Sequence, residues 1–424
     1  MKKFVSMLAL GSILFGFSAC SSEENSVDTP VSDGRVFVKL DNVVGPTSRM
    51  TETAKTDKES AELHNGYIVF STPNGGIRQH YEIVTSEDDV VDAHTILLDE
   101  LREGKTFEGI PGDVTNVAII ANTTNEELNP ADFHNNNIKF KADIFARKLQ
   151  LRNQYADNMN HVALYDMKQL QGSAGVGSMS ATLELKPMVA RLEIAKITPG
   201  PNIMEYKVEG IYLAGFYNQA YMNQVCARED WSFPDYDNAD PQAALDEFYK
   251  GYSYLSNTDI KGVTETGIGM GSNGEQDVER NITAFYPTED GKVWAYPFFG
   301  KYDQSPSDDH YGVRLIVKLS GLKMYLKNES TGDMELRDVY DYDIKRGIDP
   351  AVAGIRYLNI SGFVEDPNNT LAEPIQFYNG NVYVVENFEV TTQYLSEKIM
   401  PADINVNLTV SVKPWVIKKV YPQI

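Results

Sequence analysis

Short runs of apolar or alternating side chains, separated by turn residues, are the feature that most constrains how this chain folds. Alternation marks a strand with one buried face, and clusters of Pro, Gly and Asn between such runs favour turns. Strands that follow one another without long helices between them pair in antiparallel sheets. The sequence therefore predicts an all-β fold with minor α content, built from antiparallel β-sandwiches. The runs lie at residues 36–40, 67–70, 81–84, 95–101, 117–120, 161–165, 181–197, 206–213, 292–299, 311–319, 355–360, 381–385 and 404–412.

Three segments depart from this strand pattern. A helix is predicted at residues 129–151, where Asn129 caps the first turn and a proline follows it. A second, shorter helix is predicted to begin at Asp240, again with proline in the first turn, and to continue through Tyr249. Residues 257–281 are polar and rich in glycine, which predicts a mobile surface loop.

The first residues of the chain have the pattern of a bacterial lipoprotein signal. Two lysines precede an apolar run at residues 4–17, which ends in two small residues before Cys20. The run is too short for a permanent membrane span, so residues 1–19 are interpreted as a signal peptide and Cys20 as the lipidated first residue of the exported protein. Residues 20–34 are polar and too poor in apolar side chains to fold, which predicts a tether.

A short strand with a cleavable loop follows the tether. Val36, Val38 and Leu40 alternate with outward-facing residues, which predicts one buried face. The strand gives way to a Gly-Pro break and a polar loop, in which a trypsin-like protease would cut between Arg49 and Met50. A strand that belongs to the fold and is followed by such a loop could leave and open an apolar groove. The alternative is an ordinary first strand with an ordinary loop.

Charge and cysteine content limit the classes of function. The chain has 38 basic and 60 acidic residues, a net charge of −22, which argues against nucleic acid as a partner. Residues 1–49 carry five charges of each sign, so a cut after Arg49 leaves the net charge unchanged. The 2 cysteines are Cys20 and Cys226, so lipidation of the first leaves no internal disulfide, and the second is interpreted as a small buried residue.

The length of 424 residues suits two cores of ordinary size. The Pro-Gly-Pro sequence at residues 199–201 is the best candidate for the boundary between them. The predicted domains are therefore residues 35–199, with 35–49 as a removable part, and residues 200–424.

The end of the chain mirrors its beginning. Alternating apolar residues at 406–412 predict a half-buried strand that ends at Pro414, and a second extended piece follows at residues 415–421. A strand at a free carboxyl end can pair with the open sheet edge of a neighbouring molecule. Which of the two pieces would leave its own fold stays open. The candidate donor residues are Val406, Leu408, Val410, Val412, Trp415 and Ile417.

Taken together, these segments resemble the fimbrillins, the FimA/Mfa-type pilins that build type V pili in Bacteroidia. The residues that carry the resemblance are Cys20, Arg49, VARLEI at 189–194, AGIRYLNI at 353–360 and VSVKPW at 410–415. Their order spans nearly the whole chain, although no single motif is diagnostic. The region 228–281 has no counterpart in the resemblance.

The resemblance implies two transthyretin-like antiparallel β-sandwich domains and export as a lipoprotein whose precursor is anchored in the outer membrane. It implies that an arginine- or lysine-specific protease removes the leader and the first strand. Arg49 matches the cleavage position, and Arg35 is a poorer candidate because a cut there leaves the strand in place. The C-terminal strand of another pilin subunit then enters the groove, so that subunits polymerise by donor-strand exchange into a fimbrium that supports cell adhesion.

Other functions are less consistent with the sequence or remain alternatives to this one. The main alternative is a monomeric surface lipoprotein, or a pilus anchor or tip, that binds glycans or host protein. An extracellular hydrolase is disfavoured because no acid, base or nucleophile set is recognisable. Two aromatic groups could form sugar platforms, although core packing is the commoner reason for such spacing. These groups are Trp231, Phe233 and Tyr236, and Trp294, Tyr296, Phe298 and Phe299.

Cofactor and metal motifs are weak in this sequence. The glycines at residues 269–274 fit a nucleotide-loop pattern but lie in a polar segment with no strand before and no helix after them. Asp235, Asp237 and Asp240 lack the glycine and distal glutamate of a calcium loop, and the histidines show no metal-ligand spacing. We therefore expect no cofactor, no metal and no enzymatic activity. Stalk, tip and anchor roles stay open.

Overall fold

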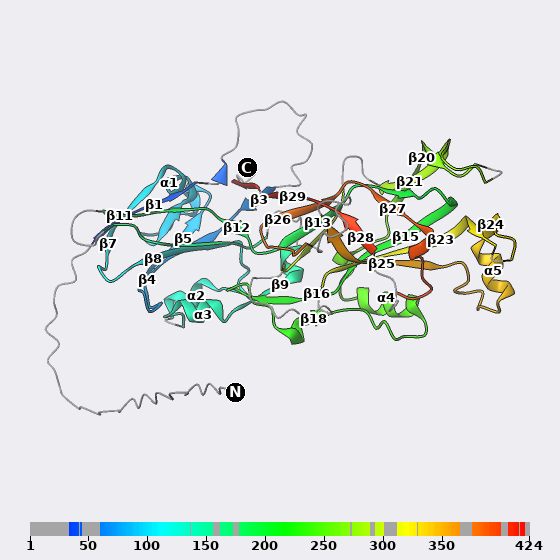
Figure 1. Ribbon diagram of the computed structural model, residues 1–424. Coiled ribbons are helices and arrows are strands. Elements are labelled where there is room, and N and C mark those ends of the chain that lie inside the picture. Colours follow the sequence, from blue (N-terminus) through cyan, green and yellow to red (C-terminus); the bar gives the residue numbers. More distant parts are fainter. Residues whose placement is uncertain are drawn as a thin grey trace, which may run out of the picture.

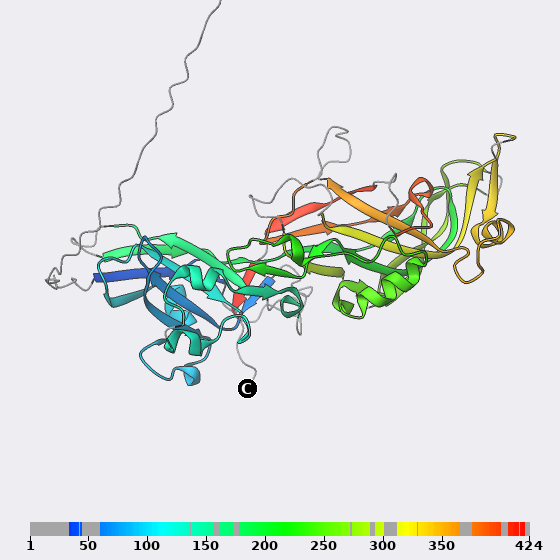
Figure 2. The ribbon, with the colours of Figure 1, turned by 90° about the horizontal axis from the view of Figure 1, so that it is seen from below.

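The computed structural model describes residues 34–41, 43–44, 60–135, 137–155, 162–172, 178–271, 274–288, 293–300, 312–328, 330–364, 375–399, 406–414 and 416–419. These residues form two β-rich lobes arranged along one long axis (Figures 1 and 2). The predicted lipidation residue Cys20, the predicted cleavage residues Arg49 and Met50, and Trp415 lie outside the described ranges. No helix within those ranges has the length and apolar character needed to cross a membrane.

The first lobe is a sandwich of two sheets. A six-stranded sheet faces a three-stranded sheet of order β11-β1-β7, and Phe70 of the larger sheet contacts Phe107 of the smaller at 5.0 Å between ring centroids. Central strands β4 and β8 are buried along most of their length because both faces are covered. The larger sheet runs β12 (Lys186–Pro187), β10 (Leu164–Gln169), β8 (Asn116–Ala121), β4 (Gly66–Ser71), β5 (Ile77–Val84), β6 (Thr95–Leu97). The smaller runs β11 (Ser178–Leu183), β1 (Gly34–Leu40), β7 (Lys105–Ile110).

The second lobe contains the larger core. A four-stranded sheet packs on a long twisted sheet, and the Tyr296 hydroxyl donates to the Ile211 carbonyl across the interface at 3.1 Å. The four-stranded sheet runs β22 (Trp294–Phe298), β13 (Ala190–Ile194), β26 (Asn381–Val385), β29 (Ser411–Pro414). The long sheet runs β19 (Ser256–Asn257), β15 (Ile203–Ala214), β23 (Arg314–Lys327), β25 (Arg356–Val364), β28 (Val406–Thr409), with β24 (Met334–Asp338) also on β23. A further sheet runs β20 (Ile260–Gly269), β21 (Val278–Pro287), β14 (Ile197–Pro199), β27 (Phe388–Val390).

Small sheets and short helices complete the fold. A two-stranded sheet joins the lobes, where the ammonium of Lys148 lies 2.6 Å from the carboxylate of Asp230. The small sheets are β9 (Lys148–Gln150) with β17 (Gln219–Tyr221), β16 (Phe216–Tyr217) with β18 (Trp231–Ser232), and β2 (Val43–Val44), β30 (Val416–Lys419), β3 (Ser60–Leu63). The α-helices are α1 (Leu98–Glu103), α2 (Pro130–His134), α3 (Lys141–Phe145), α4 (Pro241–Tyr249) and α5 (Val339–Lys345). The 3₁₀ helices are Glu87–Asp89, Leu151–Gln154, Arg228–Asp230, Ser253–Leu255 and Thr392–Tyr394.

The all-β prediction with minor α content is confirmed. Most strand pairs in the described ranges are antiparallel. The parallel pairs are β1–β11, β2–β30, β3–β30, β5–β6, β13–β26, β14–β27 and β25–β28. The helix predicted at Asp240 is present as α4, and the Asp240 carboxylate accepts the N–H groups of Gln242 and Ala243. This cap satisfies donors that have no partner inside the helix.

Two local predictions were wrong. The predicted Asn129 cap is present, since its side chain accepts the N–H of Ala131 at the start of α2. The helix predicted at 129–151 is nevertheless interrupted, because the Asp143 carboxylate accepts the N–H groups of Lys139 and Phe140 and so begins a second short helix. The loop predicted at 257–281 contains strand β20 and the start of β21, which pair without a break in register. Glycine suits this hairpin because a Cβ at Gly267 would lie 2.4 Å from the end of the Ile282 side chain on the partner strand.

The change of sheet partners falls before the predicted domain boundary at residue 199. Strand β12 pairs with β10 of the first lobe, whereas β13 and β14 pair with strands of the second lobe. The Pro-Gly-Pro sequence at 199–201 instead forms the turn between β14 and β15. Proline and glycine therefore end a strand here without ending a lobe.

Candidate functional site

Strand β1 is the middle strand of its sheet. It pairs in parallel with β11 from Arg35 to Leu40 and antiparallel with β7 on its other side. The predicted inward residues Val36 and Val38 are 0% exposed, and Leu40 is 1% exposed. Because neighbouring strands lie about 4.8 Å apart, loss of β1 would leave the edges of β7 and β11 about 9.5 Å apart, with three apolar pockets between them.

The outward face of β1 has weaker attachments. Arg35 pairs with Glu108 at 3.1 Å, but the two side chains are 69% and 70% exposed. Exposed ion pairs of this kind contribute little to stability. The Phe37 ring lies over Gly104, where the backbone φ is +105° and a Cβ would sit 2.2 Å from the ring. Gly104 therefore leaves the space that the Phe37 ring occupies. Sequence reasoning missed this role, since a glycine at a helix end is usually explained by the helix alone.

The C-terminal segment that contains the predicted donor residues is divided into three short strands, here called the tail (residues 406–419). Strand β28 pairs with β25, and β29 pairs with β26. Within the described part of the chain, each of these two strands lies at the edge of its sheet. Val410, between them, is 2% exposed, and its N–H donates to the Val364 carbonyl at 2.9 Å. The backbone of Val406, Leu408, Val412 and Ile417 lies in these strands.

The last strand of the tail lies between two segments from the start of the chain. Strand β30 pairs in parallel with β2 through Val43 and Val44, and with β3 through residues 60–63. Residues 416–419 consequently lie beside β3, which is labelled next to the first lobe in Figure 1. The predicted cut after Arg49 falls in the sequence between β2 and β3.

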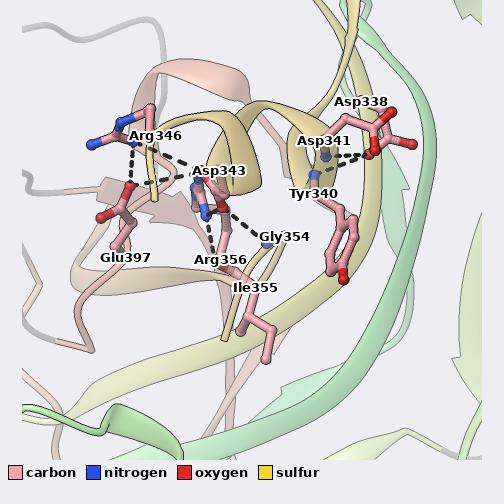
Figure 3. A network of polar contacts seen from close by, with 9 residues as sticks. All are labelled: Asp338, Tyr340, Asp341, Asp343, Arg346, Gly354, Ile355, Arg356 and Glu397. Atoms are coloured by element: carbon pink, nitrogen blue, oxygen red, sulfur yellow. Dashed lines mark hydrogen bonds and ion pairs between the residues drawn. The ribbon is translucent and has the colours of Figure 1, made fainter. Parts of the chain in front are cut away.

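A buried ion pair lies next to residues 396–397, here called the root of the tail (Figure 3). The Arg356 guanidinium donates two hydrogen bonds to the Asp343 carboxylate, at 2.7 and 2.8 Å, and the Gly354 N–H donates a third at 2.9 Å. Arg356 is 8% exposed and Asp343 is 0% exposed. The paired geometry matches the fork of a guanidinium to the two carboxylate oxygens, which is the strong form of this contact.

The same network holds the segment that leads into the tail. Glu397 accepts a hydrogen bond from Arg346 at 2.9 Å and lies 3.6 Å from Arg356. Beside it, the backbones of Ser396 and Tyr357 exchange two hydrogen bonds of 2.7 and 2.9 Å. Residues 396–397 are thus fixed to β25 and α5.

Electrostatics favour the charged form of this pair. Burial by itself would raise the pKa of Asp343, but hydrogen bonds from Arg356 and Gly354, with the charges of Arg356 and Arg346, hold that pKa below its ordinary value. The carboxylate is therefore ionised at neutral pH. Arg356 belongs to the AGIRYLNI segment, but its partner Asp343 was not singled out from the sequence.

The second aromatic group is a core feature. Trp294 and Phe299 are 2% exposed, and Tyr296 and Phe298 are 0% exposed, so they offer no surface to a sugar ring. In the first group, Trp231 and Phe233 are half-buried and stack at 5.6 Å between ring centroids. Only Tyr236, at 46%, is widely exposed in that group.

The remaining candidates support no cofactor or metal site. Asp235 accepts the N–H of Asp237 and Asp240 caps α4, so these carboxylates serve local turns. Across the described ranges, no three His, Cys, Asp or Glu side chains gather as metal ligands. Of residues 269–274, the described ones (269–271 and 274) lie at the end of β20 and before β21, so the next element is a strand and not a helix. Cys226 is half-buried, and burial, assisted by Asp230, raises the pKa of its thiol to about 12.

The solved structures that are similar to this chain include two fimbrial proteins and a putative cell adhesion protein. A fimbrilin from Porphyromonas gingivalis has 12% sequence identity and a TM-score of 0.47, with 91% of this chain and 98% of that chain covered. A putative cell adhesion protein from Bacteroides eggerthii has 12% identity and a TM-score of 0.45, with 92% and 98% covered. A tip fimbrial protein from Porphyromonas gingivalis has 11% identity and a TM-score of 0.35, with 90% and 100% covered. No protein-family model matches the sequence, and no curated protein matches it.

Proposed function

We propose that this chain is a structural subunit of a cell-surface fimbria, which polymerises by strand exchange and supports adhesion through the polymer. The observation that carries the proposal is the contrast between an interior first strand and a tail whose strands β28 and β29 lie at sheet edges within the described ranges. Removal of β1 would create an acceptor groove, and β28 and β29 could leave their sheets without opening the sheet interiors. A molecule with both properties can donate to one neighbour and accept from another.

The groove and the tail are chemically matched. The groove would expose two backbone edges and the pockets that now hold Val36, Val38 and Leu40. The tail carries a comparable alternation of branched apolar and polar residues at 406–412. Backbone pairing would supply most of the strength, and the apolar pockets would fix the register of the incoming strand.

The root of the tail gives the donor its reach. Residues 396–397 are held by Tyr357, Arg346 and Arg356, and Ile399 is 1% exposed. The residues from 400 to 424 follow this anchor, and this length of extended chain spans about 80 Å. In the proposed polymer, the tail lies in the first lobe of the next subunit while its root stays in the second lobe of its own.

Maturation completes the proposal. The precursor is exported through the signal at residues 1–19, lipidated at Cys20, and held at the outer membrane by the tether at residues 20–34. An arginine- or lysine-specific protease then cuts between Arg49 and Met50, which detaches the lipid together with β1 and β2. The partners of the mature subunit are other pilin subunits, in a homopolymer or a mixed fimbria.

The proposal is tested by the intact mass and N-terminal sequence of the protein taken from the surface of its native cell. A start at Met50, in a high-mass polymer, is the expected result. Arg49→Ala should leave a lipidated monomer, and the matched control Arg35→Ala should be processed normally. Normal polymer from Arg49→Ala would overturn the assignment of the cleavage site. A lipidated start at Cys20 in wild-type protein would identify an anchor or a monomeric surface lipoprotein instead.

A further inference from the structure

Strand β30 depends on two neighbours that belong to opposite sides of the predicted cut. Its partner β2 ends at residue 44, and its partner β3 begins at residue 60. A cut anywhere between these residues leaves β3 in the mature subunit and assigns β2 to the released leader. The tail strand therefore loses one of its two neighbours when the leader departs.

The remaining neighbour cannot hold β30 by itself. After the cut, β30 and β3 would form a parallel ribbon of four residue pairs. An isolated two-stranded ribbon is marginally stable at best, and parallel pairing is slightly weaker for each residue than antiparallel pairing. Strand β3 itself stays attached to the lobe, because Ala61 and Leu63 are 0% exposed.

Strand β2 is also tied to the body from its other side. The Arg102 guanidinium, on α1, donates from Nε to the Val43 carbonyl at 3.0 Å. Val43 is 4% exposed, so its side chain is packed as well as its backbone. This attachment explains how a strand of only two residues can hold a position beside β30.

We infer that β2 (Val43–Val44) is a latch that holds the tail in the uncut precursor, and that the maturing cut releases it. This inference rests on the proposed function. One cleavage then has two effects, because it frees β1 from the acceptor groove and removes the latch from the donor tail. An uncut subunit can neither accept a strand nor donate one, so assembly cannot begin before the leader is removed.

The latch is tested by hydrogen exchange at the amides of residues 416–419 in the full-length precursor, purified in detergent. Cleavage at Arg49 followed by departure of the leader should accelerate exchange at these amides by about tenfold or more, since a local opening then no longer has to break the β2 pairing. Val43→Pro with Val44→Pro should produce the same acceleration without a cut, because proline removes the backbone N–H groups. The matched control, Val43→Ala with Val44→Ala, keeps these groups and should retain most of the protection.

A covalent version of the latch gives a second, independent measurement. Val44 and Lys418 are direct partners, so Val44→Cys with Lys418→Cys can form a disulfide when diamide oxidises the two thiols. The cut and oxidised variant should keep its leader and form no fibres, and reduction with dithiothreitol should restore both release and assembly. Val44→Cys alone should assemble under both conditions. Fibres from the oxidised, cross-linked protein would overturn the inference.

The outcomes separate the latch from the proposed function. If cut subunits form fibres while residues 416–419 keep their protection, the latch is wrong and the strand-exchange subunit stands. If the cut abolishes the protection but no fibres form, the latch stands and the proposed function fails. Unchanged exchange in the proline variant would also overturn the latch.

Discussion

The first strand and the tail occupy opposite kinds of position in their sheets. Strand β1 has a neighbour on each side, whereas β28 and β29 each have one neighbour within the described ranges. Loss of an interior strand leaves a gap that another strand must fill, because two rows of backbone groups and an apolar face are exposed together. Loss of an edge strand only moves the edge by one position. The comparison shows how one subunit can carry both an acceptor and a donor.

The two regions are also attached by different forces. The inward side chains of β1 are apolar and fully buried, so its attachment is by packing and backbone pairing. The root of the tail is held by backbone hydrogen bonds between Ser396 and Tyr357 and by the contacts of Glu397 with Arg346 and Arg356. Arg356 is fixed in turn by its buried ion pair with Asp343. In the proposed mechanism, one cut would release β1 as a unit, whereas the root would keep the tail joined to its body after the tail strands detach.

The largest effect should come from deletion of the tail. A chain that ends at residue 405 and is cut after Arg49 should form no polymer, because it keeps an acceptor groove but has no strand to donate. Its uncut form should fold, since only strands with one neighbour, together with β30, are removed. Electron microscopy measures the polymer and circular dichroism the fold. Polymer from this truncated chain would mean that the tail is not the donor strand.

The next largest effect is expected at the ion pair. Arg356→Met should lower the free energy of unfolding by about 3–5 kcal/mol, because it leaves the buried Asp343 carboxylate without its partner. Denaturant unfolding of the uncut monomer measures this change. The matched control is Arg346→Met, whose side chain is 46% exposed and whose loss should have a much smaller effect. Equal effects of the two variants would contradict a special role for the buried pair.

A smaller, conditional effect is expected inside β1. Val38→Ala should lower the free energy of unfolding of the uncut precursor by about 2 kcal/mol, from lost apolar burial and the cavity left behind. The same substitution should leave fibres of the mature protein unchanged, because residue 38 departs with the leader. Unfolding of the precursor and dissociation of the fibre in denaturant measure the two quantities. A weaker fibre would mean that β1 stays in the assembled subunit.

Local pattern was sufficient to predict some of this site and not the rest. The alternation of Val36, Val38 and Leu40 was enough to predict the buried face of β1, because side chains in a strand alternate strictly between two faces. Nothing near β1 indicates that its neighbours are β7 and β11, which lie far along the chain and are selected by the packed core. The local sequence pattern therefore predicts which face of a strand is buried, but it does not predict whether the strand lies in the middle or at the edge of its sheet.

The ion pair and the hairpin were missed for related reasons. Arg356 alternates within a strand pattern like any outward polar residue, and only its contact with Asp343 on helix α5 allows it to be buried. The glycines of residues 257–281 predicted a loop. In the structure, Gly267 lies in strand β20, and the Ile282 side chain of the paired strand β21 occupies the space that a Cβ at Gly267 would need. In both cases the decisive partner lies on another element, and sequence periodicity does not report it.

The pH dependence of stability should distinguish the ionic root of the tail from the apolar attachment of β1. The folded chain holds the pKa of Asp343 below that of the unfolded chain, so the carboxylate stabilises the fold above about pH 4, and this contribution is lost as the pH falls further. Thermal unfolding from pH 7 to pH 3 should show this loss. Asp343→Asn should have a flatter profile in the acidic range, whereas Val38→Ala should shift the whole profile without changing its slope. An unchanged slope in Asp343→Asn would assign the acid sensitivity to other carboxylates.

The smallest effect should come from the outward face of β1. Arg35 and Glu108 are joined at 3.1 Å, but water surrounds both side chains, and exposed pairs of this kind contribute about 0–1 kcal/mol. Arg35→Ala should therefore change the unfolding free energy of the precursor by less than Val38→Ala does, and added salt should not alter the difference between Arg35→Ala and wild type by more than this amount. Denaturant unfolding at low and high salt measures it. A loss as large as that of Val38→Ala would mean that charge, and not the apolar face, retains the strand before cleavage, and the contrast between β1 and the root of the tail would disappear.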